Sequence, residues 1–213
     1  MQPNEKNKIK IKLCGLTRPS EIEVANLLHP DYVGFVFVKN SRRYVSLERV
    51  RTLKELLHPE ILAVGVFVDE EPEAVAALLS AGVVDLAQLH GKEDEAYISR
   101  LRELTEKPMI KAFSVRGEKD IERACESAAD FVLLDAGDGG TGTAFNRELL
   151  VGMNRPYFLA GGLDASNVGE VVKRWQPYAV DVSSGIETDG VKDAGKMQDF
   201  ANAVRKYAPY GSS

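Results

Sequence analysis

The run Tyr32-Val33-Gly34-Phe35-Val36-Phe37-Val38 is apolar throughout, and a polar loop separates it from an amphipathic stretch at residues 46–57. In that stretch four leucines and a valine line one face at helical spacing. A run that is apolar on both faces fits a buried parallel strand. Residues 32–57 therefore predict one strand followed by one helix.

This unit repeats along the chain. The ends of successive apolar runs lie 21 to 30 residues apart, which leaves room for one helix and tight loops each time. We expect strands at residues 9–14, 32–38, 61–68, 84–89, 109–115, 131–135, 157–161 and 179–183. We expect helices at residues 19–28, 46–57, 72–81, 93–104, 119–129, 165–175 and 194–207, with a weaker one at 145–151.

Eight such units in 213 residues predict a lean α/β protein, a single-domain (β/α)₈ TIM barrel over residues 9–207. Residues 1–8 are expected to be a frayed start and residues 208–213 a tail. An open doubly wound sheet is the alternative, but such sheets usually have five or six strands and do not explain eight evenly spaced runs.

Composition excludes several classes of protein. The chain has 27 Lys and Arg against 32 Asp and Glu, a net charge of −5. No apolar run approaches the ~20 residues of a membrane span, and mild acidity argues against a nucleic-acid partner, although a pocket can be locally positive. Two cysteines and a polar start without a signal peptide predict a cytoplasmic protein. The three histidines lack the spacing of a metal site, so no metal is expected.

In such barrels the chemistry lies where the strands end. Three glycine-rich segments follow consecutive strands: residues 137–142, which include Gly140 and Gly142; the pair Gly161 and Gly162; and the segment Ser183-Ser184-Gly185. Glycine lets backbone N–H groups approach an anion closely, so these segments favour a phosphate site over simple tight turns. The glycines of residues 137–142 also match G-x-G-x-x-G, but after a sixth strand and not at the start of a Rossmann unit.

Candidate acid, base and carboxylate-binding groups lie at or near the ends of the first, second, sixth and eighth strands. Cys14 follows the first strand, and a thiol there can act as a nucleophile or base or be a small buried hydrophobe. Asp135 follows four apolar residues at the catalytic rim, where it can serve as a general acid or cap a turn. Asp181, within an apolar strand, can bind a substrate or form a buried ion pair. Arg42 or Arg43 can pair with a ligand carboxylate.

Several motifs, in order along residues 8–206, resemble the phosphoribosylanthranilate isomerase family of tryptophan biosynthesis. The matching segments are Lys12-Leu13-Cys14-Gly15-Leu16-Thr17, Gly34-Phe35-Val36-Phe37, Ser41-Arg42-Arg43-Tyr44-Val45, Val64-Gly65-Val66-Phe67-Val68, Gln88-Leu89-His90-Gly91, Leu133-Leu134-Asp135, Gly139-Gly140-Thr141-Gly142, Leu159-Ala160-Gly161-Gly162-Leu163, Val180-Asp181-Val182-Ser183-Ser184-Gly185-Ile186-Glu187 and Gly190-Val191-Lys192-Asp193.

The resemblance implies a cofactor-free Amadori rearrangement of N-(5′-phosphoribosyl)anthranilate to 1-(2-carboxyphenylamino)-1-deoxyribulose 5-phosphate on a barrel. It implies that Cys14 is the general base, Asp135 the general acid and Arg43 the partner of the anthranilate carboxylate. Lys12 lies on the same strand face as Cys14, so it is our candidate for a charge that helps the thiol to ionise.

Rival functions fit the residues less well. The histidine-pathway isomerase uses two aspartates where this chain has Cys14 and Asp135, and indole-glycerol-phosphate synthase needs a Lys/Glu set not found here. A non-catalytic phosphosugar-binding protein would not need Cys14, Asp135 and Arg43 together. Asn146 and Arg147 stand where many family members have Asp-Trp, so we expect a local change at the sixth helix. The oligomeric state, monomer or homodimer, is left open.

Overall fold

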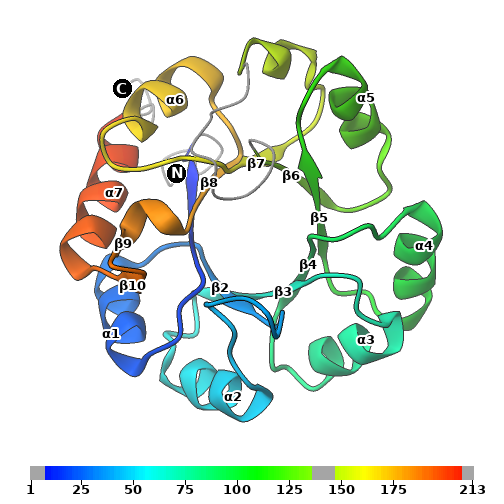
Figure 1. The fold of residues 1–213 in the computed structure, drawn as a ribbon, viewed down its shortest axis with the longest axis horizontal. Coiled ribbons are helices and arrows are strands. Elements are labelled where there is room, and N and C mark those ends of the chain that lie inside the picture. Colours follow the sequence, from blue (N-terminus) through cyan, green and yellow to red (C-terminus); the bar gives the residue numbers. More distant parts are fainter. Residues whose placement is uncertain (1–7, 136–146, 208–213) are drawn as a thin grey trace, which may run out of the picture.

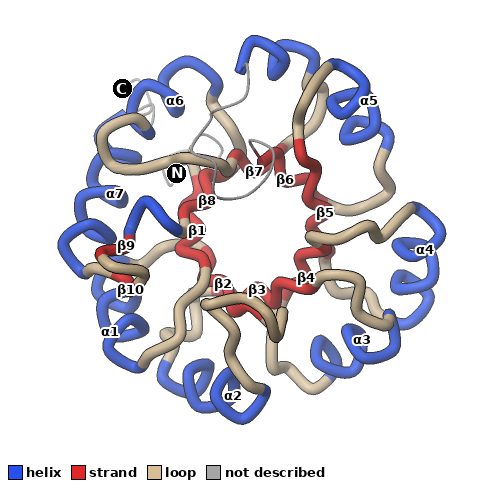
Figure 2. Tube along the Cα trace, viewed as in Figure 1, coloured by secondary structure: helices blue, strands red, loops and turns tan. Residues whose placement is uncertain are grey.

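The computed structural model describes residues 8–135 and 147–207, which form a closed ring of parallel strands surrounded by helices (Figures 1 and 2). The ring runs in chain order from β1 to β8, and β8 pairs with β1 to close it. Its strands are β1 (Lys10–Cys14), β2 (Tyr32–Val36), β3 (Leu62–Phe67), β4 (Leu86–Leu89), β5 (Met109–Ser114), β6 (Phe131–Asp135), β7 (Tyr157–Leu159) and β8 (Ala179–Val182). The predicted (β/α)₈ barrel is confirmed.

Helices follow the strands on the outside of the ring (Figure 2). They begin where sequence signals place them: Pro19 opens α1, Ser46 accepts the N–H of Arg49 at the start of α2, and Asp94 does the same for Tyr97 at α4. The α-helices are α1 (Pro19–Leu28), α2 (Leu47–Leu56), α3 (Pro72–Ser80), α4 (Glu95–Leu104), α5 (Glu118–Glu126), α6 (Val168–Trp175) and α7 (Ala194–Tyr207).

Two local features differ from the predictions. The weak helix expected at residues 145–151 is a short 3₁₀ helix, η2 (Arg147–Gly152), closed by an N–H of Met153 bonded to the carbonyl of Leu150. Pro156 lies close behind it, so an α-helix has no room to continue. After the 3₁₀ turn η3 (Ser184–Ile186), a small hairpin of β9 (Glu187–Thr188) and β10 (Val191–Lys192) was not expected from the sequence.

The apolar core has two layers. Side chains such as Val64, Ile110, Leu133 and Phe158 fill the inside of the ring, while the opposite strand faces pack against the helices. This alternation explains why the strands read as apolar on both faces. No helix within the described ranges is long and apolar enough to cross a membrane.

Candidate active site

Cys14 ends β1 and is buried, and Lys12 lies two residues below it on the same face. Lys12 is opposite Asp181 of β8 in the strand register, and its Nζ donates to Asp181 Oδ1 at 2.8 Å. Both side chains are almost completely buried. The structure thus shows the buried ion pair of Asp181, while substrate binding by this carboxylate stays a prediction.

Lys12 also acts on the neighbouring thiol. Burial raises the pKa of Cys14 above its ordinary value of 9.0, and the Lys12 charge and its hydrogen bond to Cys14 oppose this without overcoming it. Burial tends to lower the pKa of Lys12, but Asp181 and Cys14 together raise it. Lys12 thus has the predicted influence on Cys14, yet the resting form of the cysteine is the neutral thiol. A Cβ on Gly34 would lie 2.6 Å from Cys14 Sγ and 3.2 Å from Lys12 Nζ, so glycine makes room for both groups.

A second buried carboxylate, that of Glu187 in β9, forms ion pairs with three cationic side chains at the mouth of the barrel. Arg43 holds it with two parallel bonds, Nε to Oε1 at 2.6 Å and Nη2 to Oε2 at 2.9 Å. Arg42 Nη2 donates to Oε2 at 2.7 Å, and Lys192 Nζ of β10 donates to Oε1 at 2.7 Å. Burial tends to raise the pKa of Glu187, but its bonds to Arg43 and Lys192 lower it overall. The carboxylate is therefore charged, and the cluster carries an excess of positive charge.

This cluster is connected to the end of β1. Lys192 Nζ donates to the backbone carbonyl of Ser183 at 2.9 Å and lies 3.2 Å from its hydroxyl, and that hydroxyl donates to the carbonyl of Cys14 at 3.1 Å. The sequence reasoning did not assign a role to Glu187 or Lys192. The signal that could have found them is Asp189-Gly190, a hairpin turn with φ of 51° and 80° that places the two residues opposite each other.

Asp135 ends β6 and is partly exposed at the same mouth, beside His90 at the end of β4. The distance from His90 Nε2 to Asp135 Oδ2 is 3.6 Å, and His90 Nδ1 lies 3.0 Å from Gln88 Nε2. When the Gln88 amide donates to Nδ1, the ring proton is on Nε2 and faces the carboxylate. His90 is thus the neighbour that can fix the position of Asp135.

The predicted phosphate loops lie after β7 and β8. Gly161 and Gly162 have φ of 86° and 62°, a conformation that glycine adopts without strain. A Cβ on Gly185 would lie 1.9 Å from the carbonyl of Leu163, so these two loops touch through backbone atoms. Ser183 and Ser184 lie in the same turn. Gly140 and Gly142, the other predicted contacts, fall outside the described residues.

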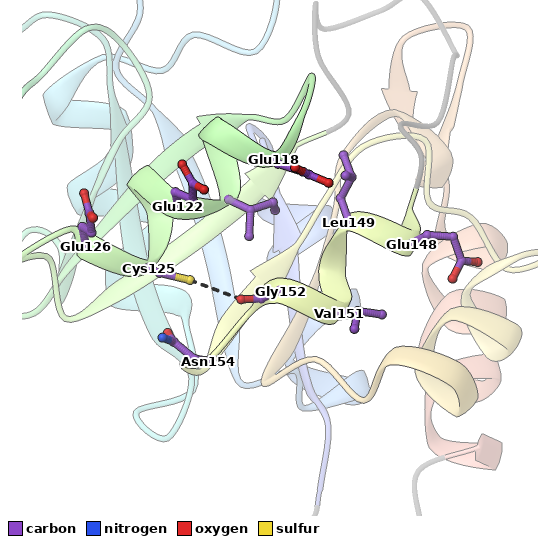
Figure 3. Close-up of a pocket in the computed structure, with 10 residues that line it drawn as sticks. Glu118, Glu122, Cys125, Glu126, Glu148, Leu149, Val151, Gly152 and Asn154 are labelled. Atoms are coloured by element: carbon purple, nitrogen blue, oxygen red, sulfur yellow. Dashed lines mark hydrogen bonds between the residues drawn. The ribbon is translucent and has the colours of Figure 1, made fainter.

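A cavity of about 770 Å³ lies elsewhere, on the outside of the barrel between α5 and η2 (Figure 3). Glu118, Glu122 and Glu126 of α5 line it, and Cys125 Sγ is 3.7 Å from the carbonyl of Gly152. None of the predicted site residues that the structure describes lines it. The candidate acid, base and cations lie instead at the strand ends, which are the candidate active site.

Comparison with known proteins identifies the family of the chain. Residues 11–203 match the family model described as N-(5′-phosphoribosyl)anthranilate (PRA) isomerase. A protein of that name from Endomicrobium trichonymphae is 42% identical over 200 residues, which cover 92% of this chain and 98% of the relative.

Two solved structures are also similar. One is a phosphoribosyl anthranilate isomerase in complex with reduced 1-(o-carboxyphenylamino)-1-deoxyribulose 5-phosphate, with a TM-score of 0.81 and 33% identity over 93% of this chain and 99% of that one. The other contains monomers of the dimeric enzyme from Thermotoga maritima, with a TM-score of 0.82 and 34% identity over the same shares. The chain therefore belongs to the N-(5′-phosphoribosyl)anthranilate isomerase family.

Proposed function

We propose that the chain converts N-(5′-phosphoribosyl)anthranilate to 1-(2-carboxyphenylamino)-1-deoxyribulose 5-phosphate, in tryptophan biosynthesis, with Cys14 as general base and Asp135 as general acid. Family membership supports the reaction. The observation that carries the residue roles is the strand-end pair itself. A buried thiol beside a lysine ends β1, and a carboxyl beside a histidine ends β6.

The proton transfers of this reaction balance without a cofactor. Asp135 donates a proton to the furanose ring oxygen, the C1′–O bond breaks, and the nitrogen lone pair forms an iminium ion. Cys14, as the thiolate, then removes the proton from C2′, and the resulting enolamine tautomerises to the ketone. Asp135 and Cys14 return to their starting forms by exchanging protons with solvent. Each group acts on one side of the sugar, which fits their positions on separate strands of the ring.

Only the thiolate form of Cys14 can remove the C2′ proton, so the neutral resting thiol must first lose its proton to solvent. Burial favours the uncharged form of Cys14 in the free protein, and Lys12 offsets only part of that effect. Formation of the iminium ion places a second positive charge close to C2′. That charge makes the C2′ proton more acidic and favours a thiolate beside it. The thiolate is thus most populated when the intermediate that needs a base is present.

Arg43 retains the hydrogen-bonding capacity to bind the anthranilate carboxylate. Its bonds to Glu187 use Nε and one proton of Nη2. Among the residues that the structure describes, this leaves the edge formed by Nη1 and Nη2 for a second carboxylate. A planar guanidinium can hold a carboxylate on each of two edges. Arg42 and Lys192 supply the charge that offsets repulsion between Glu187 and a second carboxylate.

The phosphate is assigned to the backbone N–H groups of the loops at Gly161-Gly162 and Ser183-Ser184-Gly185. Asp164 accepts the N–H groups of Ser166 and Asn167, so the first turn before α6 is already capped. The N–H groups for an anion must therefore come from the loops themselves. Their direct packing through Gly185 brings both loops to one place.

The test follows the loss of anthranilate fluorescence with freshly prepared phosphoribosylanthranilate. The wild type is compared with Cys14→Ala, Asp135→Asn and the control Cys125→Ala, which removes the other cysteine, on α5. We expect turnover in the wild type and the control, and a loss of about 10²- to 10⁴-fold in each of the other two variants. Full activity in Cys14→Ala or Asp135→Asn would remove that residue's role, and an inactive wild type would refute the proposed reaction.

A further inference from the structure

The opposite end of the barrel holds a cluster of side chains that the reaction does not use. His29 follows α1 and His58 follows α2, at the two loops that lead into the first residues of β2 and β3. Their rings meet edge to face, with centroids 4.9 Å apart and planes at 75°. Glu60 lies beside them, its Oε2 3.9 Å from His58 Nδ1. We propose that His29, His58 and Glu60 form a binding site for a zinc ion.

The donor atoms are close enough for a single ion. One ligand atom from each of the three side chains lies within 4.8 Å of the others, a grouping unique among the residues that the structure describes. Ligands about 2.0–2.2 Å from a tetrahedral zinc ion lie roughly 3.4 Å from one another. Rotation of the exposed side chains closes the difference, since His58 and Glu60 are 40% and 82% exposed.

The backbone beneath the cluster is already fixed. The Asn26 amide joins the two loops, since its Nδ2 donates to the carbonyl of Leu56 at 2.8 Å and its Oδ1 accepts the N–H of His58 at 2.9 Å. Arg205 of α7 donates to the carbonyl of His29 at 3.2 Å. Binding of an ion therefore has to order only three side chains, because hydrogen bonds already hold the ends of the two helices together.

The donor set selects the kind of metal. Two imidazoles and one carboxylate suit zinc and disfavour calcium or magnesium, which prefer all-oxygen sites. Three protein ligands leave the fourth position to water. Because the cluster lies at the strand N-terminal end, away from Cys14 and Asp135, the ion has a structural role and links α1 to α2.

The experiment titrates the metal-free protein with zinc chloride and follows the imidazole Cε1–H signals by NMR. The chain has three histidines, so each signal can be assigned by substitution. We expect the signals of His29 and His58 to shift, to saturate at one zinc ion per chain, and the signal of His90 to stay in place. Shifts confined to His90, or no shift at all, would overturn the proposal.

Calorimetric titration of variants gives a second reading. His29→Asn retains a residue that tolerates the left-handed backbone at φ 45°, and His58→Gln retains a polar side chain. Each should weaken zinc binding by more than about tenfold, because even outer-shell changes cost 10- to 100-fold. Glu106→Gln, an exposed glutamate in the loop after α4, is the matched control for Glu60→Gln. Equal zinc affinity in all variants would show that the ion binds elsewhere and would refute the site. If a variant does not fold, the NMR titration of the wild type tests the site by itself.

Discussion

Removing Lys12 tests both the energetics of the barrel interior and the control of the thiol. Lys12→Met leaves the Asp181 carboxylate buried without its partner, which lies 2.8 Å away in the wild type. Loss of one member of a buried pair costs about 3–5 kcal/mol, and both groups are too buried for solvent to reduce this. At about 2–4 °C per kcal/mol for a chain of this size, the melting temperature should fall by about 6–20 °C.

The same variant should change the pH dependence of catalysis. In the free protein the pKa of Cys14 lies above 9.0, so kcat/KM should still increase with pH at pH 9. Without the Lys12 charge the pKa of Cys14 rises further, so the increase of kcat/KM with pH, the alkaline limb of the profile, should shift to higher pH. Because the folded-state pKa of Lys12 is raised, its stabilising effect is complete below the ordinary value of 10.5 and is lost as the pH rises beyond it. The stability difference between wild type and variant should therefore narrow only in strongly alkaline solution.

Two companion variants separate these effects. Lys111→Met breaks another buried pair, in which Lys111 Nζ is 2.8 Å from Glu93 Oε2, and should destabilise the fold without shifting the pH dependence of kcat/KM. Lys12→Met combined with Asp181→Leu should recover most of the stability but only part of the pH profile, because it also removes the Asp181 charge that raises the pKa of Cys14. Thermal melting and pH–rate profiles measure both quantities. A Lys12→Met loss of less than about 1 kcal/mol, or an unmoved limb, would refute the reasoning.

Two further substitutions test the geometry of the mouth. Gly34→Ala places a methyl group 2.6 Å from Cys14 Sγ, so kcat should fall by about 10²-fold. Gly117→Ala, whose methyl group meets open space, should retain activity. Steady-state kinetics measure both variants, and an equal loss of kcat in the two would show that the effect is purely structural. Glu187→Gln frees Arg43 from its bidentate partner and should raise KM about 2- to 12-fold with little change in kcat. This range corresponds to about 0.5–1.5 kcal/mol for immobilising a side chain. An unchanged KM would show that Arg43 needs no support from Glu187.

The barrel and most strand ends could be predicted because each follows from local pattern. An apolar run that ends in Cys14 or Asp135 marks a strand end without any knowledge of its neighbours. Pairings across the ring depend instead on register. The alternation places Lys12 inside the barrel, but only the pairing of β1 with β8 brings it opposite Asp181, 169 residues away.

Closure of the barrel also determines the remaining contacts. Arg43 reaches Glu187 across 144 residues, and the hairpin that presents Glu187 is too short to show a strand pattern. The expectation of no metal site rested on the spacing of histidines along the sequence. That expectation stays a prediction. Spacing along the sequence does not show that two successive helix ends bring His29 and His58 side by side.

The distribution of charge explains how an acidic chain can bind a doubly anionic ligand. The outer cavity beside α5 is lined by Glu118, Glu122 and Glu126, so its field repels a phosphate or a carboxylate (Figure 3). At the barrel mouth three cations surround the single carboxylate of Glu187, and the positive field is focused where the strands end. The net charge of −5 therefore does not decide where an anion binds, because local charge does. We expect a phosphorylated, carboxylate-bearing substrate to be drawn to the end of the barrel that holds Cys14 and Asp135.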